Sequence, residues 1–214
     1  MTESVDDAIP PFTVEELIGR IDGAWAEGER TIAGLTDEQL AAAAAGEWAI
    51  KDHLAHLTTW VRSAIGILTK GSRPEAMGIS ESVWATGSED EINAEIAALW
   101  ADRPAAEILI AFRAAQDELR TILGGMTRDD LIRPYADYQP DDREPNADPV
   151  VGWVMGNTFG HVEMHLPAIH ALRPAPSRWT HGRGLTDARG GSSGVDFHEN
   201  GRYFHRMRFV HPLR

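Results

Sequence analysis

The chain has 214 residues, no cysteine and a formal net charge of −13 at pH 7, which argues against nucleic acid as a partner, because duplex binding depends on neutralising phosphates with Lys and Arg. The absence of cysteine removes disulfides, thiolate metal ligands and a cysteine nucleophile together, so any metal ion must be bound by His, Asp or Glu. No run approaches the roughly 18 apolar residues of a membrane-spanning helix, and the segment MTESVDDAIPPF lacks the basic region and apolar run of a secretory signal, so we expect a cytoplasmic protein without membrane contact.

The first helices are predicted from capping signals and apolar spacing. Residues 13–34 begin with Thr13 and Glu16 in capping-box spacing and continue with apolar residues at helical intervals. Thr36 repeats the capping signal before LAAAAA, which predicts a short second helix that Gly46 ends. Residues 49–70 then carry an apolar stripe at helical spacing. They are predicted to form the second long helix of the chain.

The second half of the chain continues the helical pattern. Residues 71–87 are rich in glycine and predict a loop, and residues 88–101 follow as a capped helix. Residues 104–124 form the third long helix in this interpretation. A short helical turn and a polar, proline-bearing loop precede the last long helix at 150–172, in which Pro167 is expected to kink or locally unwind the chain.

These elements predict an all-α protein. Strand signals are nearly absent before residue 173, so four long helices with short accessory helices are the economical architecture. Residues 1–172 would form one four-helix bundle. Residues 173–214 are basic and rich in Gly, Arg and His, and we expect them to form a flexible or loosely docked tail.

Three histidines form a candidate metal site. His161 and His165 are four residues apart, so on a helix they point the same way, about 40° from each other. His56 lies on the apolar stripe of the second long helix and could complete the site, with His53 one turn earlier as an outer partner or a solvent-facing residue. His170 falls on another side of its helix. The alternative is that these are ordinary core histidines with satisfied hydrogen bonds, which spacing alone does not exclude.

Two segments resemble a known family. GEWAIKDHLAHLTTW is similar to the part of the DinB/YfiT-like four-helix-bundle superfamily in which a Trp precedes a KDxLAHL helix start, and GNTFGHVEMHLPAI is similar to its closing helix with an HxxxH pair. The resemblance extends over residues 13–172 in element order. Within the superfamily the chain is most similar to the DinB-like and ClbS/DfsB-like proteins.

The resemblance implies a bound divalent metal ion, usually nickel or zinc. It places one ligand on the second long helix, His56, and two on the last, His161 and His165. ClbS-type members often lack the full set of three histidines, so its presence here favours a metal-dependent relative. The resemblance also makes a homodimer plausible. Further residues that could line the pocket or support the ligands are His53, Trp60, Asn157 and Thr158.

The predicted site supports two chemistries. A metal ion with three neutral imidazole ligands keeps its charge and lowers the pKa of bound water, which favours hydrolysis of a small electrophile. It could equally hold the thiolate of a low-molecular-weight thiol such as mycothiol or bacillithiol, as thiol S-transferases of this superfamily do. We favour thiol transfer or detoxification of a small-molecule substrate. A ClbS-like protein that binds a reactive metabolite without catalysis is the alternative.

Overall fold

The computed structural model describes residues 13–142 and 146–174, and within them the regular elements are helices, with one isolated β-bridge between Pro134 and Pro149. The all-α prediction is therefore confirmed for this part of the chain. The elements are α1 (Val14–Ile32), α2 (Asp37–Ala41), α3 (Ile50–Leu68), α4 (Arg73–Met77), α5 (Glu81–Thr86), α6 (Glu89–Trp100), α7 (Ala105–Gly124), α8 (Arg128–Leu131), a 3-10 helix (Tyr135–Asp137), α9 (Val150–Asn157) and α10 (Phe159–Ala171).

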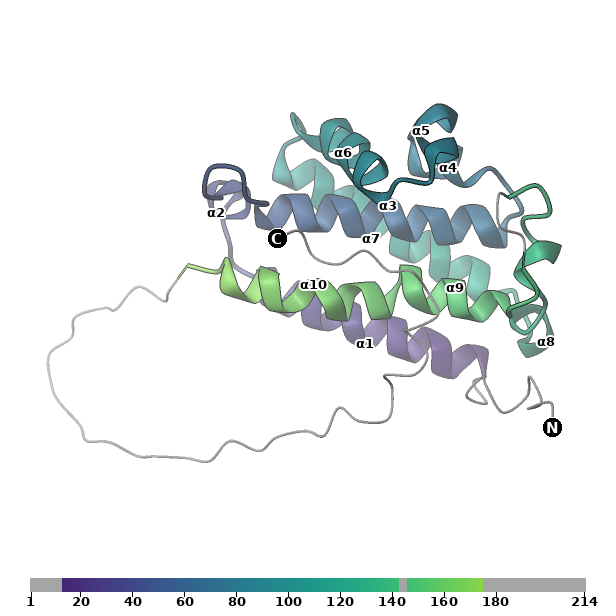
Figure 1. Ribbon diagram of the computed structural model, residues 1–214. Coiled ribbons are helices and arrows are strands. Elements are labelled where there is room, and N and C mark those ends of the chain that lie inside the picture. Colours follow the sequence, from purple (N-terminus) through teal and green to yellow (C-terminus); the bar gives the residue numbers. More distant parts are fainter. Residues whose placement is uncertain (1–12, 143–145, 175–214) are drawn as a thin grey trace, which may run out of the picture. The chain divides into compact units, whose positions relative to one another are not determined.

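The bundle consists of α1, α3, α7 and the consecutive pair α9 and α10 (Figure 1). Helix α3 packs against α7 on one side and against α9 and α10 on the other, while α1 packs against α7 and α10. The short helices α4, α5 and α6 lie along the outer side of α3. Nearly all of α3 is consequently buried, which explains why polar residues on this helix come to lie inside the protein.

The predicted caps are present. Thr13 accepts a hydrogen bond from the backbone of Glu16 and the Glu16 side chain returns one, so the capping box closes. Thr36 and Thr127 close capping boxes at α2 and α8, and Ser88 caps α6 by accepting a hydrogen bond from the backbone of Glu91. These contacts satisfy backbone N–H groups that have no partner within the first turn of a helix, so the helix starts follow from local sequence.

Two predictions for the first half of the chain were wrong in detail. Residues 71–87 are not only a loop, because they contain α4 and α5, which end at Gly78 and Gly87 in the left-handed conformation that glycine favours. Helix α2 stops at Ala41, before the alanine run ends. The following alanines are exposed, and high helix propensity does not hold so short a helix together without an apolar face to bury.

The last long helix is interrupted at Thr158 and not at Pro167. The Thr158 hydroxyl donates to the carbonyl oxygen of Val154 at 2.6 Å, while the Thr158 backbone N–H is bonded to Met155 instead. A side chain thus occupies the acceptor that the backbone would use in an uninterrupted helix. Helix α10 continues through Pro167 to Ala171. Together, α9 and α10 therefore take the place of the fourth long helix of the bundle.

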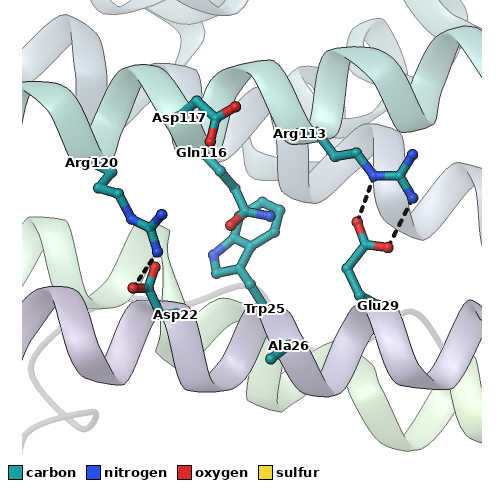
Figure 2. Close-up of a pocket in the computed structure, with 8 residues that line it drawn as sticks. All are labelled: Asp22, Trp25, Ala26, Glu29, Arg113, Gln116, Asp117 and Arg120. Carbon is teal, nitrogen blue, oxygen red and sulfur yellow. Dashed lines mark hydrogen bonds and ion pairs between the residues drawn. The ribbon is translucent and has the colours of Figure 1, made fainter.

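Two ion pairs connect α1 and α7. Arg113 donates two hydrogen bonds to Glu29, and Arg120 pairs with Asp22 (Figure 2). Between them lies a surface groove of about 330 Å³, with Trp25 among its lining residues. The Trp25 side chain is buried and contacts Phe112 with a ring-centroid distance of 3.9 Å. The groove thus lies between α1 and α7, and charged side chains of the two helices form ion pairs across it.

The predicted tail of residues 173–214 lies outside the described residues after Pro174, and so does its strand-like stretch GRYFHRMRFV. In the described parts of the chain, no helix combines the length and apolar character needed to cross a bilayer.

Candidate metal centre

Three histidines from two helices converge inside the bundle. His56 lies on α3, and His161 and His165 lie one turn apart on α10. The ring centroids are 4.8 Å apart for His56 and His161 and 4.9 Å apart for each of the other two pairs. One potential ligand atom from each ring lies within 4.8 Å of those of the other two. The antiparallel packing of α3 and α10 therefore brings together the three residues that the sequence singled out.

The cluster is kept uncharged by burial. His56 and His161 are 2% and 4% exposed, and His165 is partly buried. Burial, with the neighbouring histidines as a second cause, holds the pKa of His56 well below its ordinary value. The same causes lower the pKa of His161 to about 3 and that of His165 to about 4. All three imidazoles are therefore neutral at pH 7, which is the form that binds metal ions.

The donor set fits a divalent ion. The Nε2 atoms of His56 and His161 are 3.0 Å apart, and two nitrogens that share an ion at about 2.1 Å lie roughly 3.0 to 3.4 Å apart. The widest separation in the cluster is 4.8 Å at most, which exceeds the upper value for such a pair by no more than about 1.4 Å. Small movements of partly buried His165 would close that difference, so the three histidines could hold one metal ion.

His53 and Trp48 lie against the cluster near the N-terminal end of α3. The Nδ1 atoms of His53 and His165 are 2.8 Å apart, and His53 is buried. The Trp48 ring is nearly parallel to that of His165 at 6.2 Å and lies 5.2 Å from His53 and 5.1 Å from His56. The sequence analysis did not include Trp48 among the candidate site residues, although its place directly before the histidine-bearing helix was a usable signal.

Trp60 lies on another side of the same histidines. Its ring centroid is 6.1 Å from that of His56 and 5.9 Å from that of His161, in edge-on orientation. The indole Nε1 is buried and has no hydrogen-bond partner among the described residues, and the same holds for Nδ1 of His56 and of His161. Trp60 therefore borders the cluster, and with Trp48 it places two indole rings against the three histidines.

Asn157 and Thr158 form hydrogen bonds to their own helix. The Asn157 amide donates to the carbonyl oxygen of Trp153 at 2.7 Å, and Thr158 donates to Val154. Both residues are buried. These bonds act within the helix itself, and the supporting role of these two residues at the metal site stays a prediction.

His170 does not join the cluster. Its Nε2 lies 3.2 Å from the Thr31 hydroxyl oxygen and 3.8 Å from a carboxylate oxygen of Glu27, both on α1. Glu163, between the two α10 ligands in sequence, is exposed. The helix geometry that separated His170 from His161 and His165 thus holds in the structure, and Glu163 also faces away from them.

Arg73 is a second buried polar group, and nothing in the sequence pattern indicated its burial. The Arg73 guanidinium is 5% exposed and donates to the hydroxyls of Ser63 and Tyr135, at 2.9 and 3.0 Å. It lies over the rings of Trp84 and Trp153, at 4.5 and 5.3 Å from their centroids. No local pattern marks Arg73, because its partners come from four separate segments of the chain.

Comparison with known proteins supports the helical fold. The model of the DinB superfamily matches residues 20–169. No curated protein matches the chain.

Several solved structures have the same fold. DfsB, described as a sibling lethal factor precursor, is 17% identical with a TM-score of 0.59, and the match covers 76% of this chain and 95% of DfsB. A protein from Streptococcus pneumoniae is 13% identical with a TM-score of 0.57, over 76% of this chain and 91% of its own. The colibactin self-resistance protein ClbS, solved in complex with dsDNA, is 15% identical with a TM-score of 0.56, over 77% and 97%. At these identities the likeness concerns the fold.

Proposed function

The chain belongs to the DinB superfamily, and on this premise we propose that it is a divalent-metal-dependent enzyme that transfers a low-molecular-weight thiol to a small electrophilic molecule. The observation that carries the proposal is the convergence of three neutral imidazoles, two of them buried and one partly buried. Nickel and zinc are the proposed metals. An all-histidine site also accepts copper or iron, so availability decides among them.

The ligand set determines what the site would bind next. When bound, the ion supplies a +2 charge that three neutral ligands leave uncompensated, and this favours an anionic ligand such as a thiolate or hydroxide. His56, His161 and His165 would hold the ion. Trp48 and Trp60 border the rings and would limit the access of water, which strengthens electrostatic interactions in the pocket.

The thiol must be a cosubstrate, because the chain contains no cysteine. In the proposed reaction the thiol sulfur forms a bond to the electrophilic carbon, the leaving group departs with its electron pair, and the thiol proton passes to solvent. Mycothiol and bacillithiol are the proposed thiols. Hydrolysis of the electrophile at the same site is the alternative reaction, in which water replaces the thiol as nucleophile.

A binding protein without catalysis is the second candidate. It is favoured by the fold shared with ClbS, which is described as a self-resistance protein. Because ClbS was solved with dsDNA, duplex DNA is included among the ligands to be tested, although a net charge of −13 opposes binding to phosphates. This candidate predicts ligand binding that persists when the histidines are replaced.

Metal content is the first test. Protein purified without a histidine tag should contain about one equivalent of nickel or zinc, and His56→Ala and His161→Ala should contain far less. His170→Ala is the matched control, since it removes a histidine of α10 that contacts α1 instead. Wild-type protein without stoichiometric metal under metal-replete conditions contradicts the proposal.

Thiol dependence is the second test. Metal-loaded protein is assayed with mycothiol, bacillithiol and glutathione against a chromogenic aryl chloride, with labelled duplex DNA as a separate binding probe. Thiol-dependent product formation that is lost in His161→Ala supports the transferase. Product without added thiol indicates the hydrolase, and DNA binding without turnover indicates the binding protein.

The homodimer and the cytoplasmic location stay predictions. Light scattering of the purified protein checks whether it is a dimer.

A further inference from the structure

A fourth histidine contacts the proposed metal ligands. His53 is buried on α3, one turn before His56, and its Nδ1 lies 2.8 Å from Nδ1 of His165. The two rings meet edge to face at 5.1 Å and 67°. We propose that His53 is a positioning residue, which holds the imidazole of His165 in the tautomer and orientation that the metal requires. This inference rests on the proposed metal centre.

The hydrogen bond assigns the protons of both rings. A bond between two Nδ1 atoms contains one proton, so one imidazole donates and the other accepts. Because Nδ1 of His165 is engaged with His53, Nε2 is the nitrogen left to bind a metal ion, and its lone pair must be free. The proton of His165 therefore lies on Nδ1, and His53 accepts it. The proton of His53 then lies on its own Nε2.

His165 is the ligand that most needs such a partner. His56 and His161 are enclosed by the core, at 2% and 4% exposure, whereas His165 is only partly buried. Two residues later, Pro167 lacks the N–H that would bond the carbonyl of Glu163. The ring of His165 is thus fixed less by packing and by its own helix than the other two, and a side-chain hydrogen bond restricts it instead.

Trp48 supports the same pair from the segment that precedes α3. Its ring is parallel to His165 within 13° and edge-on to His53 at 67°. The backbone next to it is anchored, since Ala49 donates its N–H to the Asp52 carboxylate at 2.9 Å. His53 and His165 consequently have an aromatic neighbour whose position is set by the start of α3. Outer partners of this kind typically change metal affinity by about 10- to 100-fold.

Metal affinity in three variants tests the proposal. Chelator competition should show that His53→Ala binds nickel or zinc about 10- to 100-fold more weakly than wild type. His53→Asn should restore most of the affinity, because the Asn carbonyl oxygen occupies nearly the position of Nδ1 and accepts the same proton. His170→Ala should bind as wild type. Equal affinity of His53→Ala and His170→Ala overturns the inference.

One spectroscopic measurement separates positioning from ligation. The visible spectrum of the cobalt-loaded protein should indicate the same number of nitrogen ligands in wild type and in His53→Ala. A lost ligand, or loss of all metal as in His161→Ala, would make His53 a ligand and overturn its positioning role.

The metal-free protein gives an independent answer. Imidazole ¹⁵N NMR should show His165 protonated on Nδ1 in wild type and shifted towards the Nε2–H tautomer in His53→Ala. A wild-type His165 protonated on Nε2 overturns the inference whether or not metal binds. If wild type binds no metal but His165 is protonated on Nδ1, the proposed function is wrong, whereas the hydrogen bond between His53 and His165 is confirmed.

Discussion

The Nε2 atoms of His56 and His161 lie 3.0 Å apart inside the bundle, although 105 positions separate the two residues in the chain. At this distance the two nitrogens share either one proton or one metal ion. Both rings cannot be charged, since two imidazolium N–H groups would then face each other in a buried place. Proton binding and the folded state of this cluster are therefore linked.

Acid should destabilise the metal-free protein, because its buried histidines resist protonation in the folded state. The pKa of His161 is lowered to about 3 and that of His165 to about 4, whereas an unfolded histidine titrates near about 6.5. Below that value the unfolded chain binds protons that the native cluster excludes. The stability due to the neutral cluster is thus complete above about pH 6.5 and falls as the pH decreases towards 4, by about 1.4 kcal/mol per pH unit for each such histidine.

Urea unfolding of chelator-treated protein at pH 7 and pH 5 measures this loss. In His161→Gln one titrating group is removed, so the free energy of unfolding should depend less steeply on pH than in wild type. His170→Gln is the control, since His170 lies outside the cluster. The same slope in wild type and in His161→Gln would show that the cluster does not exclude protons.

Replacement of Arg73 by Met should destabilise the protein strongly. The Arg73 guanidinium is 5% exposed, contacts Asp142 at 3.5 Å and donates to Tyr135, whose hydroxyl also bonds Asp142. Its removal breaks this ion pair and the hydrogen bonds of a buried cation, and breaking a buried pair by removing one partner typically costs about 3 to 5 kcal/mol. Chemical denaturation measures the change in the free energy of unfolding.

Arg113→Met provides the comparison for an exposed ion pair. Arg113 bonds Glu29 in a two-pronged geometry, but its side chain is 55% exposed. Water screens such a pair, so the expected loss is below about 1 kcal/mol. If both arginine variants lose similar stability, burial does not determine the strength of these contacts.

Gly66→Ala should weaken the packing of α4 on α3. A β-carbon at this position would lie 3.0 Å from Cβ of Ala76 and 3.3 Å from Cα of Arg73, and backbone atoms cannot yield as a flexible side chain does. We expect a loss of about 1 to 2 kcal/mol despite the higher helix propensity of alanine. A β-carbon at Gly23 in α1 would meet open space, so Gly23→Ala should gain about 0.5 to 1 kcal/mol of stability. Thermal unfolding should therefore show a lower melting temperature for Gly66→Ala and a higher one for Gly23→Ala.

Two buried tryptophans should differ in their response to phenylalanine. The Trp100 indole donates to the Thr59 hydroxyl at 3.0 Å, whereas the Trp25 indole N–H has no partner in the described part of the chain. Trp100→Phe loses a hydrogen bond worth about 1 kcal/mol, and Trp25→Phe removes a donor that gains nothing in the folded state. Denaturation should find Trp100→Phe the more destabilised. The reverse order would indicate a partner for Trp25.

Local chemistry determined the helices and the candidate ligands. Capping residues such as Thr13 and Ser88 bond the backbone three positions away, so their effect is readable from a few neighbouring residues. The spacing of His161 and His165 fixed their common direction for the same reason, and the family resemblance supplied His56. The loop predicted at 71–87 failed because α4 and α5 are too short for apolar periodicity to reveal, although their serine caps and glycine ends were visible.

Only the tertiary structure decided how these parts meet. The 2.8 Å contact of His53 with His165, the position of Trp48 beside the cluster, and the enclosure of Arg73 by Trp84 and Trp153 all join segments that are distant in sequence. Such contacts depend on the register of packed helices, which is set by how the whole core fills space and not by any local pattern. The sequence therefore predicted a three-histidine site in a helical bundle, with His53 and Trp60 among its candidate neighbours. Packing determined the actual contacts around the three histidines, including those of Trp48.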